Sequence, residues 1–145
     1  MPEPALLEPK ETAHPEHRYI LIVSDDTAWT GHATQELEMS IAPVSVSIAA
    51  NAHGASELIM QRSIAFDKYI VGDNPQFRET LRFLARFTRG NRDIMAISNL
   101  DDRIWNAYDI GFENLYFREP LEEHPKAFPE SRMYTDLQHM LRGRP

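Results

Sequence analysis

The chain has 145 residues, of which 42% are hydrophobic and 26% are charged, and its formal net charge is −7. This length fits one globular domain and leaves little room for a second. No apolar run approaches the roughly 20 residues of a membrane-spanning helix, and no leader-like segment opens the sequence, so we expect a cytoplasmic protein without a membrane partner. The absence of cysteine excludes disulfides, thiol nucleophiles and zinc–cysteine sites, and the acidic balance argues against nucleic acid as a partner.

Two proline-containing segments hold most of the negative charge. Residues 1–17 contain four glutamates against one lysine, and residues 119–130 have the same balance, so each contributes −3. Proline interrupts both helices and sheet ladders. We therefore predict a disordered tail at 1–17 and a folded domain at 18–145, with an irregular acidic loop at 119–130 before the last helix.

The first elements along the chain follow from apolar periodicity. A continuous apolar run at 19–23 predicts a strand buried on both faces. An i, i+4 apolar stripe predicts a helix at 32–41, with Thr27 or Thr30 as its N-cap. Alternating apolar and small polar residues at 44–49 predict a second strand.

The middle of the chain continues the alternation of helix and strand. Residues 56–62 predict a short helix, and residues 66–71 predict a third strand that ends in a turn. The amphipathic pattern of 76–88 is the clearest helix signal in the sequence. Its start has an ordinary explanation in Asn74 as a cap and Pro75 in the first turn.

The last third of the chain adds two strands and two helices. Residues 93–98 predict a fourth strand, 101–110 a helix and 115–118 a fifth strand. A final helix is marked by four apolar residues at helical spacing: Met133, Leu137, Met140 and Leu141. Strands that alternate with helices through short connections predict an α/β fold, a doubly wound parallel sheet with helices on both faces.

Polar residues at the ends of the predicted strands carry a resemblance to a known family. They lie in four segments: Ile20-Leu21-Ile22-Val23-Ser24-Asp25-Asp26, Phe66-Asp67-Lys68-Tyr69-Ile70-Val71-Gly72-Asp73, Ile97-Ser98-Asn99 and Tyr116-Phe117-Arg118-Glu119-Pro120. In this order they resemble the CheY-like receiver domain of bacterial two-component response regulators, over about residues 18–145. The resemblance implies a five-stranded flavodoxin-like sheet in the order 2-1-3-4-5.

The family's chemistry implies roles for several of these residues. Asp73 is the candidate phosphoacceptor, and Asp25 and Asp26 are the candidate Mg²⁺ ligands. Ser98 and Tyr116 match the hydroxyl and aromatic positions that transmit the signal. Each has an ordinary alternative, because acidic pairs form turns and caps, Ser98 can bond its own backbone, and Tyr116 can be core.

Three residues depart from the family's pattern. Counted from Asp67, the acceptor position falls on Gly72, which leaves Asp73 displaced by one residue and able to reach the pocket only if the strand has already ended. Ser24 stands where the first acid of the pair is expected. Glu119 replaces the lysine before the proline, and its carboxylate would repel a phosphoryl group.

These departures favour an atypical receiver, or pseudo-receiver, whose phosphorylation switch is lost or altered. Such a chain is expected to act in signal transduction through protein–protein interaction, not as an enzyme, and without a required cofactor. The resemblance implies a histidine kinase, a phosphotransferase or a downstream effector as partner, and family habit allows a homodimer. The alternative is a phosphorylatable regulator with Asp73 as acceptor and Mg²⁺ on Asp25 and Asp26. A flavodoxin-like cofactor-binding enzyme is disfavoured because no glycine-rich phosphate loop follows any predicted strand.

Two helices carry candidate interaction residues. Arginines oppose the apolar face of the helix predicted at 76–88, which is typical of a solvated face or of a docking site for an acidic segment. The helix predicted at 101–110 carries aromatic side chains three residues apart, typical either of core or of an interface. The candidate interface residues are Arg78, Arg82, Arg86, Ile104, Trp105 and Tyr108.

Overall fold

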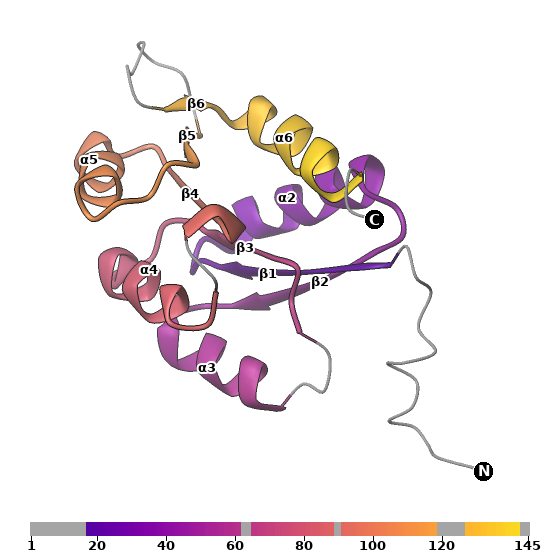
Figure 1. The fold of residues 1–145 in the computed structure, drawn as a ribbon, viewed down its shortest axis with the longest axis horizontal. Helices are drawn as coiled ribbons and strands as arrows, with labels where there is room; N and C mark the ends of the chain where they lie inside the picture. The colour runs from indigo at the N-terminus through magenta and orange to yellow at the C-terminus, as the bar shows by residue number, and fades with distance from the viewer. Residues whose placement is uncertain (1–16, 62–64, 89–90, 119–126, 143–145) are drawn as a thin grey trace.

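The structure is a computed structural model that describes residues 17–61, 65–88, 91–118 and 127–142. Six parallel strands form one sheet in the order β2-β1-β3-β4-β5-β6, with helices on both faces (Figure 1). The strands are β1 (Arg18–Val23), β2 (Val44–Ala49), β3 (Lys68–Val71), β4 (Ile94–Ser98), β5 (Leu115–Phe117) and β6 (Phe128–Pro129). The helices are α2 (Thr27–Ser40), α3 (Ala52–Gln61), α4 (Phe77–Ala85), the short 3₁₀ helix η1 (Asn91–Asp93), α5 (Asp101–Asp109) and α6 (Glu130–Arg142).

The sheet confirms the predicted fold class and the predicted order of five strands, and it has a sixth strand that was not predicted. β1 is a central strand, and its Ile22 lies opposite Ile48 of β2 and Ile70 of β3. All five strand pairings are parallel, and a helix connects each pair of consecutive strands from β1 to β5. The carboxyl ends of β1, β3, β4 and β5 therefore lie together at one end of the sheet.

The sheet separates two hydrophobic cores. On one face Leu21 and Val23 of β1 pack with α3, α4 and α5. On the other face Ile20 and Ile22 pack with α2 and α6. Successive side chains of a strand point to opposite faces, so one uninterrupted apolar run supplies both cores.

Two helices begin earlier than predicted. α2 begins at Thr27, and its N-cap is Asp26, whose Oδ1 accepts a hydrogen bond from the Trp29 backbone N–H at 3.1 Å. The predicted caps Thr27 and Thr30 were therefore wrong. α3 begins at Ala52, where the first residues are too small and polar to show an apolar stripe.

The predicted acidic loop was wrong at its end. Phe128 and Pro129 form the edge strand β6, which pairs with β5 opposite Tyr116 and Phe117. Glu130 then opens α6. Residues 119–126, together with the tail at 1–16, lie outside the described residues. No helix in the described ranges is long and apolar enough to cross a membrane.

Candidate functional site at the carboxyl ends of the strands

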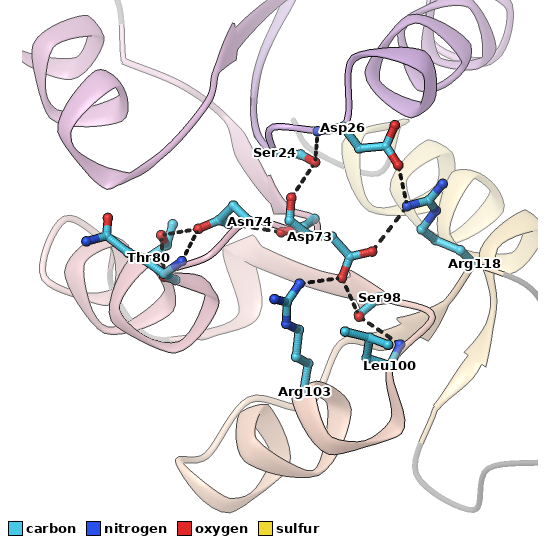
Figure 2. Close-up of polar contacts among 11 residues, drawn as sticks. Ser24, Asp26, Asp73, Asn74, Thr80, Ser98, Leu100, Arg103 and Arg118 are labelled. Carbon is cyan, nitrogen blue, oxygen red and sulfur yellow. Dashed lines mark hydrogen bonds and ion pairs between the residues drawn. The ribbon is translucent and has the colours of Figure 1, made fainter.

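The position of Asp73 follows from where β3 ends. The strand stops at Val71, and Asp73 lies in the turn that leads to α4. Its backbone carbonyl accepts hydrogen bonds from the Ser24 hydroxyl at 2.7 Å and from the Asp25 backbone N–H at 3.1 Å. The turn is thus fixed to the end of β1, and the Asp73 side chain points toward Ser98, Arg103 and Arg118 (Figure 2).

Gly72 has no room for a side chain. A Cβ atom there would lie 2.7 Å from the Trp29 ring and 3.2 Å from the Ser24 Cβ. Trp29 is buried and its indole N–H donates to Glu130 of α6 at 3.0 Å, so the ring is held in place. Asp73 therefore provides the carboxylate of this site, and the position counted from Asp67 does not.

Both oxygens of the Asp73 carboxylate accept hydrogen bonds. Oδ1 accepts from the Ser98 hydroxyl at 2.5 Å and from the Arg103 guanidinium at 2.9 Å. Oδ2 accepts from the Arg118 guanidinium at 3.1 Å. The Ser98 Oγ in turn accepts from the Leu100 backbone N–H at 2.9 Å, which fixes the hydroxyl at the end of β4 (Figure 2).

Arg118 connects two carboxylates. It follows β5 and reaches Asp26 at 2.8 Å as well as Asp73, and its guanidinium lies 5.5 Å from the centre of the Trp29 ring. The Trp29 backbone N–H and the Arg118 guanidinium lower the pKa of Asp26. Burial opposes the charge of Arg118, but the two carboxylates outweigh it and raise the pKa of that arginine.

The sequence predicted Asp26, Asp73 and Ser98 for this site but missed Arg103 and Arg118. A signal for Arg118 was present, because it is the last residue of the predicted fifth strand and so had to lie at the same end of the sheet. Arg103 lies in the first turn of α5, where its side chain turns back over the end of β4. Such a reversal cannot be read from residue spacing.

The described carboxylates do not fit a Mg²⁺ ion at this position unless Arg118 moves. Both oxygens of Asp26 are in use, one by the helix cap and one by Arg118. The Asp25 side chain is exposed. Among residues 17–61, 65–88, 91–118 and 127–142, no three or more histidine, cysteine or acidic side chains form a possible metal site. A guanidinium group supplies the positive charge instead.

Comparisons with known proteins identify the fold. No protein-family model and no curated protein matches the sequence. A two-component response regulator from Clostridium difficile superposes with a TM-score of 0.64 at 19% identity, over 87% of this chain and 97% of that one. The signal receiver domain of a DNA-binding response regulator from Colwellia psychrerythraea gives 0.63 at 17% identity, over 86% and 98%. A CheY-like receiver domain from Methanospirillum hungatei gives 0.62 at 20% identity, over 86% and 94%. The chain has the receiver fold.

Within this receiver fold, Tyr116 points inward. Only 1% of the residue is exposed, and its hydroxyl donates to the Asp136 carboxylate of α6 at 2.7 Å. Arg132 holds the other oxygen of Asp136 at 3.0 Å. Burial and the bond to Asp136 raise the pKa of Tyr116. The residue is thus part of the core, which is its ordinary interpretation, and Glu119 lies outside the described residues.

The remaining candidate interface residues divide into two groups. Ile104 is 1% exposed and packs in the core under α5, so its prediction as an interface residue was wrong. Its neighbour Trp105 is half-buried, and Tyr108 is 41% exposed, with the two rings edge-to-face at 5.7 Å. The second group is exposed and consists of Arg78 and Arg82 on α4 and Arg86 at its C-terminal cap.

Proposed function

We propose that this chain is a signal-transduction module of receiver fold that binds other proteins and does not use Asp73 as a phosphoacceptor. The observation that carries the proposal is the bonding of the Asp73 carboxylate. One hydroxyl and two guanidinium groups already use both of its oxygens. Bonds of this charge-assisted kind are among the stronger hydrogen bonds in proteins. A nucleophilic oxygen has to leave such a bond before it can attack a phosphoryl group.

Charge supports the same proposal. Arg118 lies between Asp26 and Asp73, where a divalent cation would have to bridge the carboxylates during phosphoryl transfer. The sequence also has Glu119 where the resemblance implies a lysine to pair with the phosphoryl oxygens. A carboxylate there would repel the additional charge of roughly −1.5 to −2 that phosphorylation brings.

The alternative function is a phosphorylatable regulator with Asp73 as acceptor and Mg²⁺ on Asp25 and Asp26. The contact between Asp73 and Ser98 favours it, because a carboxylate, a hydroxyl and a cation are the groups that this chemistry uses. It requires Arg118 to release both carboxylates so that a metal ion can enter.

One experiment separates the two functions. The full chain is incubated with acetyl phosphate and magnesium chloride, and its intact mass is measured beside that of a receiver domain phosphorylated by the same donor. We expect no gain in mass for this chain. A gain of one phosphoryl group that disappears in Asp73→Asn would overturn the proposal.

The proposed partners are a histidine kinase, a phosphotransferase or a downstream effector, and a homodimer is a further possibility for the same surface. The aromatic pair of α5 supports a contact there, because Trp105 and Tyr108 combine partial exposure with fixed ring geometry. Aromatic side chains of this kind contribute strongly to protein interfaces. We assign the partner-binding surface to this exposed side of α5, without Ile104.

A further inference from the structure

Three arginines form a positively charged row on the outer face of α4 and the turn after it. Arg78, Arg82 and Arg86 recur every four residues, so their side chains follow one side of the helix. All three are exposed, and none of their side chains makes a hydrogen bond or an ion pair with another residue in the part of the chain that the structure describes. We call these three residues the arginine row.

An apolar edge runs beside the arginine row. Phe83 and Phe87 are edge-to-face at 5.0 Å, and Phe87 is 48% exposed although it is a large apolar side chain. The opposite side of α4 is buried in the core. Arginine and aromatic residues together are enriched in protein interfaces, whereas a purely solvated helix face has no need of exposed phenylalanine.

The sequence contains a segment of matching chemistry. Residues 1–16 carry four glutamates against one lysine, and an apolar triplet, Ala5-Leu6-Leu7, lies among the acids. Sixteen extended residues reach about 50 Å, whereas a compact domain of this length has a radius of gyration of about 15 Å. From its junction at His17 the segment can therefore reach any face of the domain.

The second acidic segment is a poorer match. Residues 119–126 connect β5 with β6 at the far edge of the sheet, so both of their ends are fixed there. Glu130, the last acid of the stretch 119–130, already accepts hydrogen bonds from Trp29 and Tyr134. That leaves three glutamates against one lysine, with the single Leu121 where segment 1–16 has two adjacent leucines.

We propose that the acidic segment 1–16 docks on the arginine row of its own chain. Its glutamates pair with the arginines, and Leu6 and Leu7 pack against Phe83 and Phe87. The proposal does not rest on the fate of Asp73 or on the partner surface of α5. Exposed ion pairs are weak and are screened by salt, so docking is expected at low salt and not at high salt.

Paramagnetic relaxation tests this docking in the full chain. The sequence has no cysteine, so Ala5→Cys places a single nitroxide label in the acidic segment. At about 0.01 M salt, where charges act over about 30 Å, we expect the backbone amide signals of α4 to lose at least half of their intensity. At about 1 M salt, where the range falls to about 3 Å, the intensity should return.

Matched charge variants separate docking on α4 from general attraction. Arg82→Gln with Arg86→Gln changes the net charge by −2, one unit for each substitution. Gln35→Glu with Met39→Glu makes the same change on exposed positions of α2, which covers the opposite face of the sheet. We expect the broadening of α4 to disappear in the first variant and to persist in the second.

Three outcomes would overturn the proposal. The first is a labelled chain whose α4 signals keep their intensity at low salt, and the second is equal broadening in the two charge variants. The third comes from a mixture of two chains. One carries the nitroxide but no ¹⁵N, and the other carries ¹⁵N but no nitroxide. Broadening of α4 at full strength in that mixture would show that a second copy supplies the segment.

Discussion

Gly72 lets the turn after β3 pack closely against Trp29 because it lacks a side chain. We expect Gly72→Ala to lower the free energy of unfolding by about 1–3 kcal/mol, because its Cβ would overlap the fixed Trp29 ring. Gly31→Ala is the matched control, since a Cβ at that position of α2 has nothing within 4 Å and alanine favours helix by about 0.5–1 kcal/mol. Urea unfolding measures both changes. Equal stability of Gly72→Ala and the original chain would show that Trp29 gives way.

The Asp26 carboxylate links stability to pH. Its pKa is lower in the folded chain than in the unfolded chain, so its charged form stabilises the fold above the unfolded pKa of about 3.9. That contribution is lost as pH falls through the folded pKa. Asparagine keeps the helix cap but not the charge. We therefore expect Asp26→Asn to be less stable than the original chain at neutral pH, with the difference narrowing below about pH 4 in denaturant titrations. A difference that stays constant with pH would contradict this.

Some residues of the site could be predicted and others could not, because they reach Asp73 in different ways. Ser98 ends a strand, and Asp26 and Asp73 come shortly after strands, and the carboxyl ends of these strands meet, so the positions of all three follow from the parallel topology alone. Arg103 and Arg118 belong to a set of 15 lysines and arginines, most of which have no such constraint. Their roles depend on where long side chains turn after leaving the backbone, and that is decided by tertiary packing.

At the scale of elements, a hydrogen bond from Tyr116 to Asp136 joins β5 to α6 beside their apolar packing. Tyr116→Phe keeps the ring and its packing but removes the hydroxyl that donates to the carboxylate. Hydrogen bonds to charged groups contribute about 1.5–3 kcal/mol, and we expect a loss at the low end of this range because Arg132 still holds Asp136. Thermal and urea unfolding check the value, and an unchanged stability would mean that water replaces the hydroxyl at no cost.

The strands were predicted more closely than the helices, for a physical reason. β1 is an apolar run that ends before Ser24, and β2 is an alternating run that begins after Pro43, so these limits are visible in the sequence. α3 begins in Ala52-His53-Gly54, where the Asn51 side chain accepts from the Gly54 backbone N–H and no apolar stripe exists. β6 is two residues long and contains a proline, which sequence patterns assign to a loop.

At the scale of the whole molecule, one sheet has to hold two cores together. The helices α3, α4 and α5 on one face and α2 and α6 on the other share no core cluster, so each layer depends on the strands for its contact with the other. The strands themselves are buried on both faces in β1, β3 and β4. Unfolding of either layer would therefore expose the sheet and remove the support of the second layer.

Because the two layers depend on one sheet, we expect a single unfolding transition. Within it, the changes in unfolding free energy caused by one substitution in each core should add. Ile20 packs with α2 and α6, whereas Ile94 packs in the opposite core, and both are 0% exposed. They lie two strands apart, about 10 Å at the usual strand spacing, and on opposite faces. Ile20→Val and Ile94→Val should each cost about 0.5–1.5 kcal/mol, and the double variant should equal their sum within about 0.5 kcal/mol. Fluorescence and circular dichroism should follow one common urea transition in all four chains. Separate transitions, or a larger coupling energy, would show that the layers unfold independently or communicate through strain in the sheet.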